Sequence, residues 1–303
     1  MNIFKCPICT AHSFVRKAKY RACTEIFTNR DIIQCRSCQT MMVNPLPDKR
    51  QLDLYYHYYW KKETLTELLP LFEAQAAARI EFFKPLMPRG EKLSVLDIGA
   101  GFGLIYKVLS TVSGQDIRYD AVEMDPLAVD YLRTFIKPRV IFDRPEDIQG
   151  KYHVILLSHI IEHLTDPVLF LTNLSDLLHD EGILFIEVPN QDHKFKSLNE
   201  PHLFFFDEKT LSNIVVQSGY NVLRVDICGP QIAELQGNGR IALAIKNVLR
   251  RNVPHPIKTV LLRMRRIINN KPSLAGIPKE AIYDYNPWGR WIRVVALKKS
   301  RHT

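Results

Sequence analysis

Residues Val95 to Gly103 read V-L-D-I-G-A-G-F-G, an apolar run that ends in an acid and opens a turn of alternating glycines. Apolar residues at helical spacing follow from Leu104 to Leu109, so this segment predicts a strand, a tight turn and a helix. Glycine permits positive φ and lets a ligand approach the backbone closely. The helix N-terminus favours anionic or electron-rich groups. The segment therefore predicts a cofactor-binding turn.

The glycine spacing separates two cofactor classes. A dinucleotide fingerprint, G-x-G-x-x-G, would need glycine where this chain has Leu104. The chain instead has D-x-G-x-G-x-G, and a second strand, Asp120–Glu123, ends in an acid 20 residues after Gly103, where a ribose diol would be held. Together these features resemble motif I and the ribose acid of class I S-adenosylmethionine (SAM) methyltransferases. An ordinary α/β glycine turn with a chance acid is the alternative.

Two Cys-x-x-Cys pairs, Cys6 with Cys9 and Cys35 with Cys38, stand 25 residues apart near the N-terminus. Four thiolates in this pattern suit a structural zinc ion. Residues 1–44 are too few to be stable by burial alone, so the metal would supply folding energy. A redox dithiol is the alternative, which the presence of two pairs disfavours. Residues 1–44 lack the basic-aromatic stripe of single-strand binders, so nucleic acid is a disfavoured but open partner.

Composition places the chain among globular proteins. Of its 303 residues, 46% are hydrophobic and 24% charged, which excludes wholesale disorder. Since no apolar run reaches the length of a transmembrane helix and Met1–Cys6 has no signal-like apolar stretch, we expect a cytoplasmic protein with reduced thiols.

The net charge of +9 is local, because ten Lys/Arg and no Asp or Glu lie between Leu235 and Lys279. Apolar residues at helical spacing in this segment predict basic helices. They could form a solvated face, a peripheral membrane contact that makes the protein membrane-associated, or a clamp for a phosphorylated substrate.

Strands and helices alternate through the middle of the chain, which predicts an α/β, doubly wound, Rossmann-like parallel sheet. A helix is expected over Pro167–Leu178, ended by His179–Gly182, and a lid helix over Leu71–Phe83 after a Tyr-rich segment, Leu52–Trp60. That aromatic segment either packs between the ribbon and the core or forms a lid over the cofactor. The expected strands are Ser94–Ile98, Tyr119–Glu123, Val140–Phe142, His153–Leu157, Ile183–Val188, Asn221–Asp226 and Trp291–Lys298.

The expected domains are a zinc ribbon (1–44), a helical lid or linker (45–89), a SAM-binding core (90–228), a basic helical insertion (229–287) and the last strand (288–303).

Ligands of parallel sheets bind beyond the carboxyl ends of the strands, which selects the segment Ser158–Leu164 as well as the glycine turn. His159, Glu162 and His163 match a zinc-peptidase pattern, H-x-x-E-H, but a peptidase is disfavoured because the motif follows a buried strand. Ser158 and His159 are expected near the methionine end of SAM. Glu162 and His163 are expected to line the pocket or to cap the next element.

The loop after the fifth strand carries the candidate general base. It holds His193, Glu200 and His202 before an aromatic wall, Leu203–Phe206. Methyl transfer is an in-line displacement in which the enzyme aligns the nucleophile and often removes its proton. A His near its ordinary pKa suits the second task, so His202 beside Glu200 is the favoured base.

The order of these motifs resembles zinc-ribbon class I SAM-dependent methyltransferases, similar to sugar C-methyltransferases and to enzymes of polysaccharide clusters. The resemblance implies SAM as donor, with Glu123 at the ribose, Asp147 or Asp143 near adenine, and His202 as base with Glu200 and His163 as further catalytic candidates. It places the glycine-turn residues and Met124 at the cofactor: Asp97, Gly99, Gly101, Phe102 and Gly103.

The chain also departs from those relatives. Residues 189–219 contain no Tyr, although the sugar enzymes use one near the base, and Gln39 stands where the second knuckle usually has Gly. Some quinone-type O-methyltransferases hold a divalent ion with acids and a His, but His159 replaces one acid, so that metal is not assigned. We therefore expect a methyltransferase with a structural zinc, acting on an anionic carbohydrate or glycolipid intermediate. The alternatives are an RNA or small-molecule O-methyltransferase, and a non-catalytic SAM-fold binding protein.

Overall fold

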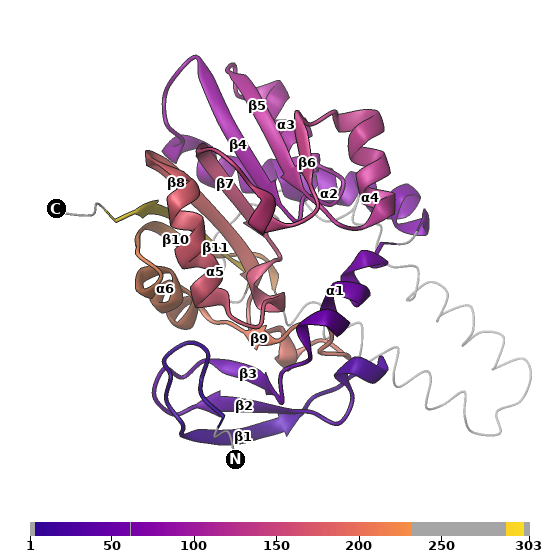
Figure 1. Ribbon diagram of the computed structural model, residues 1–303, viewed down its shortest axis with the longest axis vertical. Coiled ribbons are helices and arrows are strands. Elements are labelled where there is room, and N and C mark those ends of the chain that lie inside the picture. The colour runs from indigo at the N-terminus through magenta and orange to yellow at the C-terminus, as the bar shows by residue number, and fades with distance from the viewer. Residues whose placement is uncertain (1–3, 61, 232–288, 300–303) are drawn as a thin grey trace, which may run out of the picture.

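The computed structural model describes residues 4–60, 62–231 and 289–299 (Figure 1). The predicted basic insertion, 229–287, lies almost wholly outside these residues. So do its basic stretch, Leu235–Lys279, and the membrane or substrate contact expected of it.

The central sheet has its strands in the order β10-β11-β8-β7-β4-β5-β6 within the described residues, which confirms the predicted α/β, Rossmann-like fold of seven strands. From β8 to β6 all neighbours are parallel, whereas β11 is antiparallel to both β8 and β10. The sheet predicted as parallel is therefore mixed, because the last strand enters between β10 and β8 in the opposite direction. The strands are β4 (Lys92–Ile98), β5 (Asp116–Val122), β6 (Val140–Phe142), β7 (Tyr152–Ser158), β8 (Leu178–Pro189), β10 (Tyr220–Gln231) and β11 (Gly289–Lys298).

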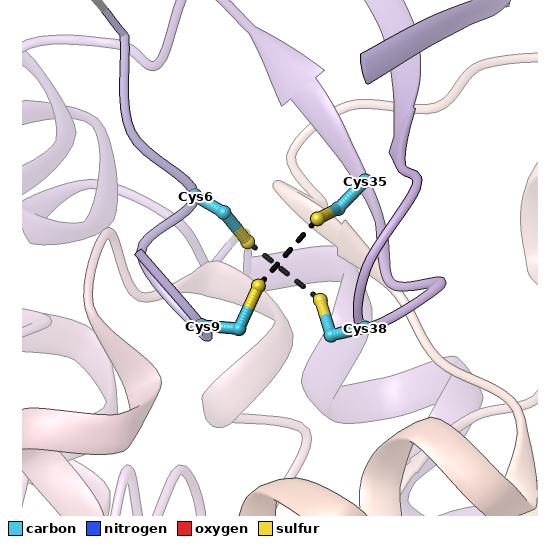
Figure 2. A group of neighbouring side chains, drawn as sticks. All are labelled: Cys6, Cys9, Cys35 and Cys38. Carbon is cyan, nitrogen blue, oxygen red and sulfur yellow. Dashed lines mark hydrogen bonds between the residues drawn. The ribbon is translucent and has the colours of Figure 1, made fainter. Parts of the chain in front are cut away.

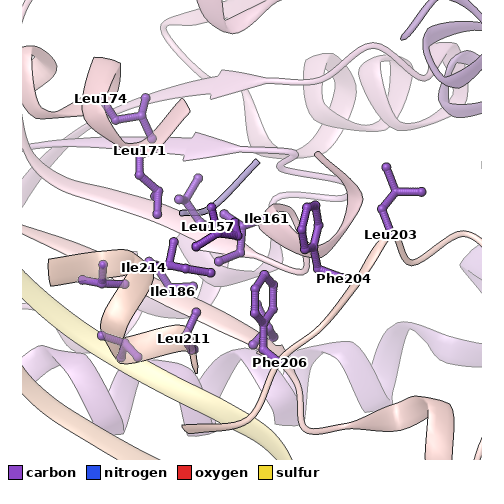
Figure 3. Close-up of a cluster of buried hydrophobic side chains, with 14 of the residues drawn as sticks. Leu157, Ile161, Leu171, Leu174, Ile186, Leu203, Phe204, Phe206, Leu211 and Ile214 are labelled. Atoms are coloured by element: carbon purple, nitrogen blue, oxygen red, sulfur yellow. The ribbon is translucent and has the colours of Figure 1, made fainter. Parts of the chain in front are cut away.

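Alternating side chains give the sheet two buried faces. On β4, Leu93 and Val95 belong to one core cluster, while Leu96 and Ile98 belong to the other. Helices α2 (Lys62–Phe83) and α3 (Leu104–Val112) cover the first face. Helices α5 (Pro167–Leu174) and α6 (Glu208–Gln217) cover the second, where Leu171, Leu211 and Ile214 meet the sheet (Figure 3). This period-2 alternation under two helical layers is the doubly wound arrangement.

The helix boundaries follow local chemistry. Pro85 lies just past the end of α2, as expected of a residue that cannot continue a helix. The helix predicted over Pro167–Leu178 is shorter than expected: α5 ends at Leu174, and the predicted terminator His179–Gly182 belongs to strand β8. The remaining short elements are α1 (Lys49–His57), α4 (Pro126–Tyr131), η1 (Glu25–Phe27), η2 (Lys84–Leu86), η3 (Leu132–Ile136), η4 (Pro145–Asp147), η5 (Ile161–His163), η6 (Ser175–Leu177) and η7 (Asp192–Lys194).

The cysteine module forms a second, small sheet below the first (Figure 1). Its strands β1 (Phe14–Lys19), β2 (Asp31–Cys35) and β3 (Met41–Asn44) pair antiparallel. A fourth strand, β9 (Phe204–Phe205), comes from the loop after β8 and pairs with β3. The sequence did not predict this strand, which joins the ribbon to the loop that carries His202.

Among the helices of the described residues, none combines the length and apolarity needed to cross a lipid bilayer.

Candidate active site

The glycine turn after β4 has the predicted backbone. Gly99, Gly101 and Gly103 all have positive φ, at 68°, 52° and 63°. A Cβ on Gly99 would lie 2.1 Å from Cδ1 of Ile160, so a larger residue there would force this side chain to move and would strain the backbone. Gly103 directly precedes helix α3. Gly99 is exposed, whereas Gly101 and Gly103 are buried. The turn therefore places small residues at a helix N-terminus, the position from which such turns bind cofactors.

Glu123 lies at the end of β5 and reaches this turn. One carboxylate oxygen accepts the N–H of Gly101 at 2.7 Å, and the other accepts the N–H groups of Met124 and Asp125, each at 2.9 Å. Burial raises the pKa of Glu123, while these three backbone N–H bonds oppose the shift. The fold thus brings the predicted ribose acid to the predicted glycine turn.

Asp97 is buried at the end of β4, where it accepts a hydrogen bond from the Tyr119 hydroxyl at 3.2 Å. Burial raises the pKa of Asp97 to about 7, with Tyr119 and Arg79 acting in the opposite direction. Phe102 is buried in the same turn and Met124 is half-buried beside Glu123, whereas Asp143 and Asp147 lie on the surface after β6. These adenine-side candidates stay predictions.

The Tyr-rich segment contacts both the ribbon and the glycine turn, through different residues, and its role as a lid over the cofactor stays a prediction. Tyr55 packs edge-on against Phe27 of the ribbon, with ring centroids 5.2 Å apart. Trp60 packs on Phe102 at 4.9 Å and lies 3.4 Å from the position of a Cβ on Gly101. Its backbone N–H donates to Asp125 at 2.9 Å. Tyr55 therefore joins ribbon and core, and Trp60 covers the glycine turn.

His159 directly follows Ser158, the last residue of β7, and its backbone is in the left-handed region, with φ of 58°. Its two ring nitrogens each lie 3.2 Å from a carboxylate oxygen, Nδ1 from Glu162 and Nε2 from Glu187. Burial alone would lower the pKa of His159, but these two carboxylates raise it above its usual value. The contacts of His159 with two buried carboxylates hold the loop beside the glycine turn.

Glu187 is the centre of a buried ion network that the sequence reasoning missed. Arg79 of α2 donates twice to one carboxylate oxygen, at 2.8 and 2.7 Å, and Arg293 of β11 donates to the other at 2.6 Å. Arg293 lies directly opposite Glu187 in the β8–β11 register. The signal was an arginine inside the otherwise apolar run Trp291–Leu297, which could have indicated a buried acid on the neighbouring strand.

His202, the candidate base, is buried beside an acid that the sequence reasoning also missed. Its Nδ1 lies 2.7 Å from Oδ2 of Asp192, and its Nε2 lies 3.5 Å from Nζ of Lys196. Burial acts to raise the pKa of Asp192, but His202 and Lys196 together hold it below its usual range. Among the described residues neither Nδ1 of His202 nor Oδ2 of Asp192 has an aligned hydrogen-bond partner, so the two groups form a close charge contact.

His163 and Glu162 stand next to His202. The rings of His163 and His202 are 4.8 Å apart, and the Tyr56 hydroxyl lies 2.8 Å from Nδ1 of His163. Burial lowers the pKa of His163 to about 3, although Glu162 opposes this, so His163 is neutral. Tyr56 comes from α1, so a tyrosine does reach this group of residues, from outside the loop 189–219.

One ligand atom each from Glu162, His163 and His202 lie within 4.8 Å of one another. Within the part of the chain that the structure describes, Oε2 of Glu162 is buried without a hydrogen-bond partner. Imidazole and carboxylate together suit a divalent transition metal. The group could therefore hold a cation or orient a polar acceptor.

Glu200, predicted beside the base, faces the ribbon. Its carboxylate accepts the thiol of Cys23 at 2.8 Å and the backbone N–H groups of Cys23 and Thr24 at 3.2 and 3.0 Å. His193 packs edge-on against Phe205, and burial lowers its pKa to about 4. These contacts tie the loop to the ribbon.

The four predicted zinc ligands converge (Figure 2). The Sγ atoms of Cys6 and Cys38 are 3.7 Å apart, and those of Cys9 and Cys35 are 3.5 Å apart. Zinc bonded to four sulfurs at about 2.3 Å would hold them about 3.8 Å apart, so the donor set and spacing fit this ion. The hydrogen-bond contact with Cys6 lowers the pKa of Cys38 to about 4.

The seven-stranded sheet, the glycine turn and the acid after β5 define a class I SAM-dependent methyltransferase domain. Residues 59–225 match the family described as a methyltransferase domain, and because they are more than half of the chain, this chain belongs to that family.

Ubiquinone biosynthesis O-methyltransferases are among the curated relatives. That of Bartonella quintana is 28% identical over 120 residues, covering 36% of this chain and 46% of the relative. That of Bartonella bacilliformis is 30% identical over 113 residues, covering 34% and 43%. The chain thus spans less than half the length of either relative.

A solved structure of the complex between the Haloferax volcanii Trm112 methyltransferase activator and a methyltransferase contains a chain of the same fold. It is 13% identical with a TM-score of 0.52, and the match covers 84% of this chain and all of that one.

Proposed function

We propose that this protein transfers the methyl group of SAM to a carbohydrate or glycoconjugate acceptor, such as a nucleotide sugar, a phosphorylated sugar or a lipid-linked glycan. The observation that carries the methyl-transfer proposal is the convergence of Glu123 and the glycine turn, joined by the 2.7 Å bond from the Gly101 N–H. In this proposal Glu123 accepts the ribose hydroxyls, and Asp97, Ser158 and His159 lie around the methionine part.

When bound, SAM would supply an electrophilic methyl group for in-line attack by the acceptor nucleophile, with the carbon–sulfur electron pair leaving on a neutral thioether. His202 takes the acceptor proton on Nε2, while Asp192, 2.7 Å from Nδ1, stabilises the resulting imidazolium. The acceptor must displace Lys196, whose ammonium lies 3.5 Å from Nε2.

The acceptor class rests on the sequence. Ten basic residues without an acid between Leu235 and Lys279 favour an anionic acceptor or an anionic membrane surface. Replacing Arg263, Arg265 and Arg266 by Gln is expected to raise the acceptor KM and to leave SAM affinity unchanged. Unchanged acceptor kinetics would refute the anionic clamp.

A second candidate is O-methylation of a small phenolic molecule, favoured by the buried group of Glu162, His163 and His202 and by the names of the curated relatives. The test is transfer of labelled methyl from SAM to a panel of nucleotide sugars and catechols. We expect label on a nucleotide sugar, lost in His202→Gln and kept in His12→Gln, a matched change at an exposed ribbon histidine. Label on catechols alone would replace the carbohydrate proposal by the second candidate.

A further inference from the structure

The loop that carries His202 is held by the ribbon as well as by the core. After β8 the chain runs from Asn190 to β9, where Phe204 and Phe205 pair with Met42 and Met41 of β3. The Val43 N–H donates to the Leu203 carbonyl at 2.8 Å. The residues directly after the candidate base therefore belong to the ribbon's sheet.

Tyr20 of the ribbon bonds to the backbone of the base itself. Its hydroxyl donates to the His202 carbonyl at 3.0 Å, and both side chains are buried, at 3% and 5% exposure. Tyr20 is in turn held between Phe27 and Phe205, with ring centroids 6.4 and 6.3 Å away. The direction of this carbonyl fixes the peptide from which the imidazole projects.

Asn199 makes a second attachment. Its side-chain oxygen accepts the Arg21 N–H at 2.8 Å, and its own N–H donates to the Arg21 carbonyl at 2.7 Å. Asn199 is fully buried, and the His202 N–H donates to its carbonyl at 3.0 Å. The path from ribbon to base is therefore two hydrogen-bonded steps long.

The Arg21 guanidinium completes the attachment by donating to the carbonyls of His193, Lys196 and Ser197 at 2.7, 2.8 and 3.1 Å. These bonds satisfy loop carbonyls on both sides of Lys196, whose ammonium pairs with Asp192 at 2.9 Å. The ribbon thus orders the loop that presents both partners of His202.

We propose that the cysteine ribbon is a positioning device for His202, with Tyr20 and Asn199 as the positioning residues through which it acts. A catalytic group must be held within a few tenths of an ångström, and an isolated loop of this length does not provide that order. The ribbon supplies it, and the zinc that its cysteines fit would supply the folding energy of the ribbon. The catalytic consequence rests on the proposed function, whereas the structural coupling does not.

The test compares Tyr20→Phe with Tyr220→Phe in the zinc-loaded full chain. Tyr220 is a matched control, because its buried hydroxyl also donates to one backbone carbonyl, that of Leu171, at 2.7 Å. The readout is the ring Cε1–H proton resonance of His202, whose chemical shift reports how the imidazole lies beside Asp192. It is assigned by its loss in His202→Gln.

We expect Tyr20→Phe to shift this resonance and to accelerate amide exchange of residues 197–203 about tenfold, the effect of one lost buried hydrogen bond. Zinc content and SAM affinity should stay as in the wild type. Tyr220→Phe should leave both the resonance and this exchange unchanged.

An unchanged resonance in Tyr20→Phe would overturn the proposal. Should Tyr20→Phe lose zinc, Arg21→Ala, which changes an exposed side chain, provides the same comparison. Absence of SAM binding would refute the proposed function alone, because the resonance is measured without SAM.

Discussion

Glu187→Gln is expected to be among the most destabilising single substitutions in the core. The carboxylate of Glu187 is fully buried and is shared by Arg79, Arg293 and His159. The amide keeps the shape but removes the negative charge, so two buried guanidinium groups lose their counter-ion. Helix α2 and strand β11 are held to β8 partly through this carboxylate.

The magnitude follows from the burial of the partners. Breaking a buried ion pair by neutralising one partner costs about 3–5 kcal/mol. With a urea dependence of about 1–3 kcal/mol per molar, the unfolding midpoint should fall by at least about 1 M. Burial acts to raise the pKa of Glu187, but the two arginines hold it well below its usual value. The wild-type advantage is therefore present above the ordinary glutamate pKa and is lost as the pH falls through the lowered one.

The assay is urea unfolding at pH 7 and at low pH, followed by circular dichroism. Asp226→Asn is the matched control, because its pair with Arg224 at 2.7 Å is partly exposed on the same sheet and should contribute about 1 kcal/mol or less. Equal losses for the two variants, or a loss below 1 kcal/mol for Glu187→Gln, would refute the view that this network holds α2 and β11 to β8.

Three further outcomes are expected. Gly99→Ala should destabilise the fold more than Gly114→Ala in denaturant titrations. Both residues have φ near 68°, which alone costs alanine about 1–2 kcal/mol, but only at Gly99 would the Cβ lie 2.1 Å from a neighbour, Ile160. Equal losses of stability would contradict the predicted clash. The stability of Asp97→Asn relative to the wild type should increase as the pH rises from 4 to 7, by at most about 4 kcal/mol. Burial raises the pKa of Asp97 to about 7, so the carboxyl ionises first in the unfolded chain and the wild type loses stability over this range. A pH-independent difference between the two proteins would contradict this. Cys9→Ser should abolish stoichiometric zinc and expose residues 4–44 to proteolysis, and retained zinc measured by elemental analysis would argue against the four-sulfur site.

The parts of the fold that local pattern determines were predictable. Short apolar runs located all seven strands, and the glycine spacing located the turn after β4 that Glu123 reaches. The convergence of the four cysteines was predictable, because two Cys-x-x-Cys pairs in so short a segment are typical of a structural zinc site. These signals depend on neighbours in sequence, or on the rule that parallel strands end at one edge.

The rest depended on contacts between distant segments. Asp192, Tyr56 and Arg79 reach the site region from a turn, a linker helix and the lid helix, and no spacing in the sequence relates them to His202 or Glu187. Strand β9 is only two residues long and exists because the ribbon offers it an edge. The place and direction of β11 in the sheet likewise depend on tertiary contacts, which the hydrophobic pattern of the strand does not determine.

The central claim is that the glycine turn and Glu123 bind SAM. Calorimetric titration of zinc-replete protein with SAM tests it directly, with Glu123→Ala as the variant. Glu146→Ala is the control, because this exposed carboxylate pairs only weakly with Lys49, at 3.6 Å. We predict binding by the wild type and the control, and a Kd about 10- to 150-fold higher in Glu123→Ala, the effect of one charge-assisted hydrogen bond of about 1.5–3 kcal/mol. No binding by the wild type, or equal affinities for the two variants, would contradict the account.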